Sequence, residues 1–206
     1  MAATLYFDLG SPYVYLAVER LARFDLGDVR LRPVSLGALF KYTGRSSWGL
    51  GPDREGGMAE VERRAAEYGL PPVRWPEGWP GNYLRANRAC VAAEEAGRLE
   101  PFVTTALRLA FVEGADLGGE EAYLEAARLV GLDPEAVRVR IEDQELKDRL
   151  REYTDAAHAS GVVGVPTVQV GETLFWGDDR LEDAISWANS GRVQAAAHQK
   201  DLGGFE

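Results

Sequence analysis

Ser11 stands at a junction where a side chain can do chemistry. An apolar, strand-like run, Thr4–Leu9, stops at Gly10, and a helical pattern starts at Pro12. The N-terminus of a helix presents unpaired N–H groups and partial positive charge, so such junctions commonly hold a reactive group or a bound anion. The simpler alternative is that the Ser11 hydroxyl only caps the helix. Both roles stay open at this point.

The elements around Ser11 predict a β-α-β unit. Val29–Val34 alternates like a second strand, and the helix that opens at Pro12 separates it from the first. Proline suits the first helical position because its missing N–H would have no partner there. A strand, a helix and a strand within about thirty residues favour a right-handed parallel unit.

The middle and the end of the chain differ in pattern. From Leu36 to about Ser160 the periodicity is helical, with a Gly-rich segment, Arg45–Gly57, expected to be a loop. Two strand-like runs then flank Gly171-Glu172, which is typical of a hairpin, and a last helix is expected over Arg180–Ala188. The order is therefore β-α-β, a helical block, and β-β-α.

This order predicts an α/β protein with a thioredoxin-like fold and an all-helical insertion. We expect a discontinuous thioredoxin-like domain from residues 1–36 and 161–192, a helical insertion over 37–160, and a polar tail over 193–206.

Composition excludes several classes of protein. The 206 residues are 46% hydrophobic and 27% charged, as in an ordinary globular protein. A net charge of −10 without a basic run argues against nucleic acid as a partner. No stretch approaches the ~20 apolar residues of a membrane helix. The lack of a signal-peptide pattern and the single cysteine, Cys90, predict a cytoplasmic protein.

Two motifs carry a family resemblance. DLGSPYVYLA and GVVGVPTVQVGETLFWGDDRLEDAI, together with the helical insertion, resemble 2-hydroxychromene-2-carboxylate isomerases and kappa-class glutathione transferases, two DsbA-like groups. The resemblance implies a glutathione-dependent enzyme. Where the disulfide oxidoreductases of this group have Cys-X-X-Cys, this chain reads Ser11-Pro12-Tyr13-Val14, so it cannot cycle a disulfide of its own.

The resemblance assigns the thiol site to the start of the first helix. It implies that Ser11 is the catalytic residue and that Ser11, Pro12 and Tyr13 hold glutathione. A free thiol has a pKa near ~8.5, and a helix N-terminus lowers such a pKa by favouring the thiolate. The Ser11 hydroxyl can donate one more hydrogen bond to the sulfur.

Four further residues are implied as ligands of glutathione. Val165, before a cis Pro166, would pair with the tripeptide backbone like an added strand. Asp178 and Asp179 would receive the γ-glutamyl end, or would simply cap the helix after them. Arg45 would bind a carboxylate of glutathione or of the substrate, or lie free in solvent. Kappa-class proteins often have Asn and prolines here, whereas this chain has Arg45-Ser46-Ser47-Trp48.

Other candidates are weaker. Trp48 and Tyr83 could line a substrate pocket, although helix packing is the alternative for Tyr83. Trp75 and Trp79 are expected to be packing residues, and Cys90 is expected to be a small buried side chain. The two histidines, His158 and His198, form no Cys/His cluster with metal-ligand spacing, so we expect no metal.

The prediction is a glutathione-dependent cis–trans isomerase in aromatic compound degradation, with a small-molecule substrate. The alternatives are a kappa-class-like glutathione transferase, and a non-catalytic or other-thiol-dependent DsbA-like protein. The resembled families also imply a homodimer.

Overall fold

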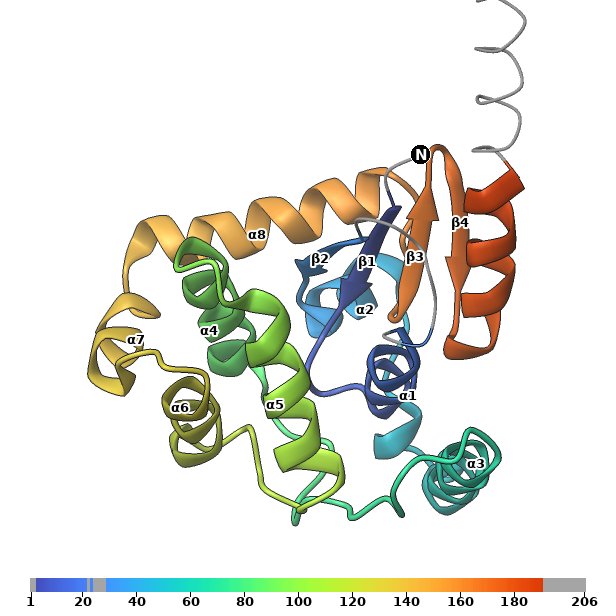
Figure 1. Cartoon of the computed structure of the whole chain (residues 1–206), viewed down its shortest axis with the longest axis horizontal. Coiled ribbons are helices and arrows are strands. Elements are labelled where there is room, and N and C mark those ends of the chain that lie inside the picture. The colour runs from blue at the N-terminus through green and yellow to red at the C-terminus, as the bar shows by residue number, and fades with distance from the viewer. Residues whose placement is uncertain (1–2, 22, 24–28, 191–206) are drawn as a thin grey trace, which may run out of the picture.

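The computed structural model describes residues 3–21, 23 and 29–190. The predicted tail over 193–206 lies outside the described residues. Among the described residues, four strands form one sheet in the order β2-β1-β3-β4, shown side by side in Figure 1. β1 pairs in parallel with β2 and antiparallel with β3, and β3 pairs antiparallel with β4. The strands are β1 Ala3–Phe7, β2 Val29–Pro33, β3 Thr167–Val170 and β4 Thr173–Trp176.

The helices divide into those next to the sheet and those of the insertion. Figure 1 shows α4, α5, α6 and α7 gathered to one side of the sheet, while α8 runs back beside β2. A helical segment follows β4 over 181–190. The bounds are α1 Pro12–Leu21, α2 Leu36–Thr43, the 3₁₀ turn η1 Trp48–Leu50, α3 Arg54–Glu67, α4 Leu84–Glu95, α5 Leu99–Phe111, α6 Glu120–Leu129, α7 Pro134–Arg140, α8 Gln144–Ala159 and the 3₁₀ turn η2 Asp178–Arg180.

The predicted thioredoxin-like order is confirmed, with corrections to several boundaries. β1 ends at Phe7 instead of Leu9, because the Leu9 N–H leaves the sheet and donates to Asn87 Oδ1 at 3.0 Å. The expected loop over 45–57 is wrong, since it contains η1 and the start of α3. Gly57 weakens the helix intrinsically, but the absence of a Cβ there lets the Trp48 ring pack on the helix.

One hydrophobic core joins the sheet to the insertion. Leu5 and Phe7 of β1 belong to the same buried cluster as Phe102 and Tyr123 of the insertion. α1 contacts α5, and α4 contacts β2. The insertion is therefore packed against the sheet and holds the loops that follow β1 and β2.

Candidate active site

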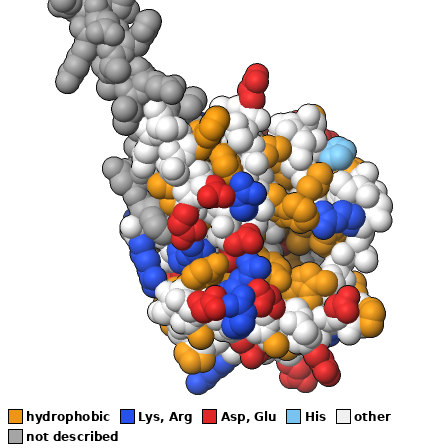
Figure 2. Space-filling view, turned by 90° about the vertical axis from the view of Figure 1, so that its right-hand side faces the viewer, with side chains coloured by type: hydrophobic (Ala, Val, Ile, Leu, Met, Phe, Trp, Pro, Cys, Tyr) orange, Lys and Arg blue, Asp and Glu red, His pale blue; other side chains and the backbone are white. Residues whose placement is uncertain are grey.

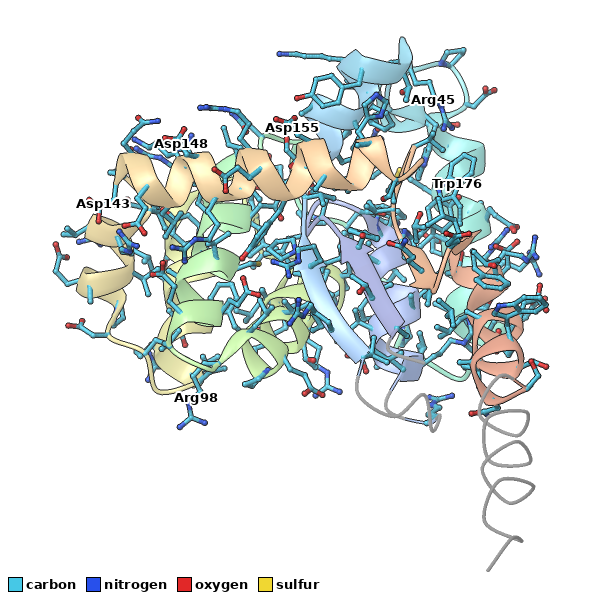
Figure 3. The ribbon with its side chains drawn as sticks, turned by 90° about the horizontal axis from the view of Figure 1, so that it is seen from above. Arg45, Arg98, Asp143, Asp148, Asp155 and Trp176 are labelled. Carbon is cyan, nitrogen blue, oxygen red and sulfur yellow. The ribbon has the colours of Figure 1, made fainter. Side chains whose placement is uncertain are left out.

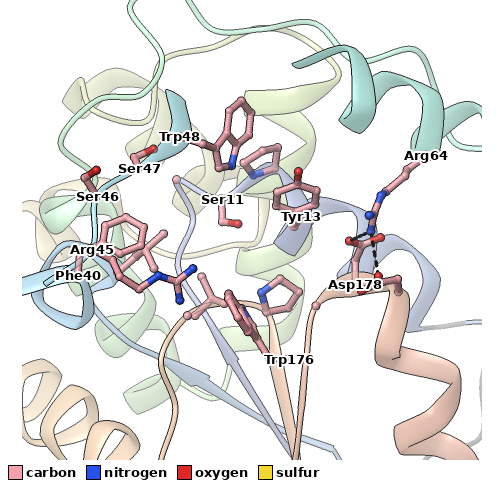
Figure 4. Close-up of a pocket in the computed structure, with 18 of the residues that line it drawn as sticks. Ser11, Tyr13, Phe40, Arg45, Ser46, Ser47, Trp48, Arg64, Trp176 and Asp178 are labelled. Carbon is pink, nitrogen blue, oxygen red and sulfur yellow. Dashed lines mark hydrogen bonds and ion pairs between the residues drawn. The ribbon is translucent and has the colours of Figure 1, made fainter. Parts of the chain in front are cut away.

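A cavity of about 380 Å³ lies at the N-terminus of α1 (Figure 4). Its walls come from segments that are distant in sequence: the β1–α1 junction, the loop after α2, the turn before β3 and the turn after β4. The residues that matter for its chemistry are Ser11, Tyr13, Arg45, Trp48, Val165 and Trp176. Most of the residues expected at the site therefore line one cavity.

Ser11 is buried, with 4% of its surface exposed, and lies in the middle of this cavity (Figure 4). Its N–H donates to the Asp8 carbonyl at 3.1 Å, and its carbonyl accepts from the Val14 N–H at 3.0 Å. Within the described part of the chain, no hydrogen bond uses the Ser11 hydroxyl or the Tyr13 N–H. The simple capping role for the hydroxyl is therefore not seen, and both donors are available to a ligand.

Asp8 fixes the geometry of this junction. Its carboxylate accepts from the Gly10 N–H and from the Leu36 N–H, both at 2.8 Å. The side chain is buried, and desolvation raises the pKa of this carboxyl group, although the hydrogen bonds from Leu36, Asn87 and Gly10 oppose the shift. Asp8 thus ties the end of β1 to the starts of α1 and α2.

The turn before β3 forms the opposite wall. The Val165–Pro166 peptide is cis, and the Pro166 carbonyl accepts from the Gly177 N–H at 2.9 Å. Among the described residues, the Val165 backbone N–H and C=O make no hydrogen bond. An extended peptide could therefore pair with Val165, as an added strand pairs with a sheet edge.

Asp178 is held inside the protein. It is 1% exposed, and its carboxylate pairs with Arg64 at 2.8 Å, the interaction dashed in Figure 4, and accepts from Tyr68 Oη at 2.9 Å. Burial raises the pKa of this carboxyl group, while Arg64 and Tyr68 oppose the shift. Asp179 beside it also pairs with Arg64, at 3.6 Å, but its side chain is 57% exposed. Of the two aspartates, Asp179 is the one open to a ligand.

Arg45 lies at the mouth of the cavity. Its guanidinium carbon stands 4.6 Å from the centre of the Trp176 ring, a cation–π contact, and Figures 3 and 4 show the two side chains on the same side of the molecule. The Trp176 ring itself lies against Gly164, where a Cβ would come within 2.8 Å of the indole nitrogen. The stacked pair leaves the Arg45 charge directed at the cavity.

Trp48 lines the cavity, and Tyr83 does not. The Trp48 ring packs on Trp79 with centroids 4.9 Å apart. Tyr83 is 9% exposed, accepts from the Gly81 N–H at 2.9 Å and fills the space beside Gly10. It lies instead in the wall of a neighbouring cavity.

Several residues of the site were not predicted. Asp8 had a sequence signal, because a carboxylate within an apolar run that is expected to be buried needs hydrogen-bond donors. Trp176 lies within the second of the two sequence motifs, but no role was predicted for it. Arg64 had no sequence signal. Arg64 reads as an ordinary polar position of a helix, and its contact with Asp178 joins residues 114 positions apart.

Nearby groups with acid–base chemistry are held neutral. Desolvation raises the pKa of Tyr13, so its phenol keeps its proton at neutral pH. Burial also raises the pKa of the Cys90 thiol, as expected for a packing residue.

The part of the chain that the structure describes contains no cluster of three or more His, Cys, Asp or Glu arranged to hold a metal ion. None of the helices in that part combines the length and hydropathy needed to cross a bilayer.

The fold and site together define a thioredoxin-fold protein with Ser11 and Val14 at the two positions where the disulfide oxidoreductases have cysteines. The chain belongs to the family of DSBA-like thioredoxin domains, whose model matches residues 3–185. Figure 2 shows the molecule from the side of α3 and β4, where acidic and basic side chains lie beside hydrophobic ones.

Comparison with curated proteins identifies enzymes as relatives. The chain is 30% identical to 2-hydroxychromene-2-carboxylate isomerase of Sphingobium xenophagum, over 86% of this chain and 92% of the relative. It is 25% identical to human glutathione S-transferase kappa 1, over 86% of both. A solved structure of a 2-hydroxychromene-2-carboxylate isomerase superposes with a TM-score of 0.80 at 24% identity, covering 98% of this chain and 99% of that one.

Proposed function

We propose that this protein is a glutathione-dependent cis–trans isomerase that acts on a conjugated acid from aromatic compound degradation, of the 2-hydroxychromene-2-carboxylate type. The observation that carries the proposal is the pair of unused donors, the Ser11 hydroxyl and the Tyr13 N–H, at the N-terminus of α1. The relatives named as isomerases support the choice of reaction.

The residues of the cavity fit a tripeptide thiol. Ser11 Oγ–H, the Tyr13 N–H and the start of α1 would hold the sulfur anion. The Val165 backbone would pair with the peptide, and the exposed Asp179 carboxylate would receive the ammonium group. Because the Asp178 carboxylate is buried against Arg64 and Tyr68, whereas Asp179 is exposed despite its own pair with Arg64, we assign the ammonium to Asp179, with Asp178 as its support.

When bound, the thiol supplies a nucleophile that converts a C=C bond to a rotatable single bond by reversible addition, and it is regenerated. The chain's own part is to keep the sulfur deprotonated and to orient the acceptor. Ser11 stabilises the negative charge of the sulfur by a hydrogen bond. Arg45 or another cation of the adjoining walls binds the carboxylate of the acceptor. The phenol of Tyr13, with its raised pKa, can contribute a hydrogen bond without competing as a base.

The experiment follows the absorbance of 2-hydroxychromene-2-carboxylate with glutathione present, for the parent protein and Ser11→Ala. Loss of a hydrogen bond to a charged group costs about 1.5–3 kcal/mol, so we expect kcat/KM to fall roughly tenfold to a hundredfold. The pKa of the bound thiol, read from thiolate absorbance against pH, should rise in the variant. Ser160→Ala, which changes an exposed serine after α8, is the control.

Three results would contradict parts of the proposal. If Ser11→Ala converts the substrate with the same kcat/KM as the parent, Ser11 does not have the proposed role. Glutathione consumed into a stable conjugate, detected by mass spectrometry, would favour the transferase reaction, which the kappa-class relatives perform by name. Titration calorimetry that finds no glutathione binding would favour a non-catalytic protein or another thiol.

We also propose a cytoplasmic homodimer. A buried cysteine without a disulfide partner supports a reducing compartment. Light scattering on the purified chain measures the assembly directly, and a mass of 22.6 kDa, that of one chain, would contradict the dimer.

A further inference from the structure

A second cavity of about 800 Å³ adjoins the cavity at Ser11. It lies among α2, the start of α4 and α8. Gly10, Leu36, Phe40 and the loop 45–47 line both cavities, so the two volumes share a wall. The cavity at Ser11 is near the lower end of the range of about 300–1,000 Å³ for small-molecule sites. A bound tripeptide would therefore fill the cavity at Ser11, and the larger second cavity would remain free for a second reactant.

The second cavity is strongly cationic in a protein of net charge −10. Of the described residues that line it, five carry positive charge and one, Asp8, is a carboxylate. Both Asp8 oxygens already accept backbone N–H groups. The cationic residues are Lys41, Arg45, Arg88, Lys147 and Arg151.

Arg88 differs from the other cations of this cavity because one of its guanidinium nitrogens is buried without a hydrogen bond among the described residues. Arg85, one turn earlier on α4, pairs with Glu142 at 2.9 Å, and Arg151 pairs with Asp148 at 2.8 Å. The Arg88 Nε is buried without a hydrogen bond, and no ion pair of Arg88 is formed among the described residues. A buried donor without an acceptor is costly in a folded protein, so an absent acceptor is the simplest explanation.

Glu142 does not serve as that acceptor. Its pKa is lowered by the hydrogen bond from Lys147 first, and also by the charges of Arg85 and Arg88. Its oxygens, however, pair with Arg85 and Lys147, both at 2.9 Å. Lys41, on the α2 side of the cavity, also forms no ion pair within the described part of the chain.

We propose that the second cavity binds an aromatic carboxylate anion, with Arg88 as the anchor for the carboxylate and Lys41 as a second cation. The apolar side chains of Leu36, Phe40 and Leu84 supply a surface for the aromatic body. A guanidinium is suited to a carboxylate because its N–H groups match the two oxygens. This inference rests on the proposed function, in which the anion is the acceptor and the Ser11 cavity holds the thiol.

The experiment uses a fluorescent planar acid, coumarin-3-carboxylate, titrated into the full protein with and without saturating glutathione. Coumarin-3-carboxamide, which lacks the charge, is the matched ligand. The variants are Arg88→Gln and Lys41→Gln, and the control is Arg98→Gln, an exposed arginine at the far end of the molecule from Arg45 (Figure 3). Thermal unfolding checks that each variant folds. Because Lys41 is exposed, the substitution Lys41→Gln removes a charge from the cavity without changing the hydrophobic core.

We expect the carboxylate to bind the parent protein at least tenfold more tightly than the carboxamide, roughly the effect of one charge-assisted hydrogen bond. Arg88→Gln should weaken carboxylate binding by about tenfold to a hundredfold, the range for a charge-assisted hydrogen bond. Lys41→Gln should weaken it severalfold, and Arg98→Gln should leave it unchanged. Glutathione should bind alongside the acid, and glutathione affinity should be the same in Arg88→Gln as in the parent.

Equal binding of carboxylate and carboxamide would overturn the inference, as would carboxylate binding that neither Arg88→Gln nor Lys41→Gln reduces. Competition between the acid and glutathione would overturn the separation of the two sites. Failure of the proposed function is distinguishable, because it appears as loss of glutathione binding while the charge-dependent binding of the acid persists.

Discussion

At the scale of single residues, Asp8 shows how a buried charge can organise a site without touching a ligand. Its two oxygens bind the N–H groups of Gly10 and Leu36, which start the loop before α1 and the helix α2. The same burial raises the pKa of the carboxyl group. The residue thus positions two walls of the cavity, and its ionisation couples the stability of those walls to pH.

The sign of that coupling gives a prediction. Because the pKa of Asp8 is raised above its ordinary value of 3.8 in the folded protein, the folded state binds more protons, and the stability that Asp8 contributes is lost as pH rises through the raised pKa. We expect the free energy of unfolding of the parent, minus that of Asp8→Asn, to fall as pH rises from 3.8 towards neutrality. The fall should be about 1.4 kcal/mol for every tenfold change in proton affinity on folding.

Urea unfolding at several pH values measures this difference. Asp155→Asn, which changes an exposed carboxylate that accepts from Tyr42 Oη, is the control for substitution of an aspartate. A difference between parent and Asp8→Asn that stays constant or grows with pH would show that Asp8 does not titrate with the predicted sign.

At the scale of elements, the Trp48 and Trp79 rings in the wall of the site pack directly against the backbone of glycines. A Cβ at Gly57 would come within 2.3 Å of the Trp48 ring, and a Cβ at Gly49 would come within 2.7 Å of the Trp79 ring. These contacts join η1 to α3 and to the connector before α4. Gly49 and Gly57 lower the local propensity for helix or turn, but their lack of a Cβ leaves the space that the two tryptophan rings occupy.

Adjacent glycines in α3 allow a matched test. A Cβ at Gly56 would meet no heavy atom within 4 Å, whereas Gly57 lies against Trp48. Because alanine is the better helix former, we expect Gly56→Ala to stabilise the protein by about 0.5–1 kcal/mol. Gly57→Ala should lose that gain or become destabilising, and should weaken glutathione binding by displacing Trp48.

Urea unfolding and titration calorimetry on both variants measure these effects. Equal stabilisation by the two substitutions, with glutathione affinity unchanged, would show that Trp48 moves aside without cost and does not shape the site.

Prediction from the sequence succeeded for elements and less well for contacts between them. The order of strands and helices follows from local periodicity, and the motif around Ser11 marks the end of a strand. The start of α3 was missed, because Gly56 and Gly57 read as a loop until the packing of Trp48 is known. The Arg64–Asp178 pair was missed as well, since nothing local distinguishes Arg64 from Arg63 beside it, which forms only exposed pairs.

At the scale of the whole molecule, the thioredoxin-like part and the insertion share one core. Leu5 of β1, Leu39 of α2, Phe102 of α5 and Leu181 after η2 belong to the same buried cluster. A boundary drawn at residues 36 and 160 therefore divides the sequence without dividing the hydrophobic interior. We expect the two parts to unfold together.

Urea unfolding followed by far-ultraviolet circular dichroism and by tryptophan fluorescence tests this expectation. The far-ultraviolet signal is dominated by the helices of the insertion. The fluorescence reports on both parts, through Trp48, Trp75 and Trp79 of the segment 37–160 and through Trp176 and Trp187 at the end of the chain. The two curves should coincide within error. A separate, earlier transition in either signal would show that the insertion and the sheet are independent folding units.

The central place of β1 in the sheet has a consequence for synthesis on the ribosome. Ala3 of this strand faces Val170 of β3 across the ladder, so one edge of β1 has no neighbour until most of the chain has been translated. A strand edge left open in this way is a template for pairing with other polypeptides. A newly made chain would thus expose an unpaired strand edge for nearly the whole of translation. Its thiol site would be complete only when Val165 and the hairpin after it leave the ribosome.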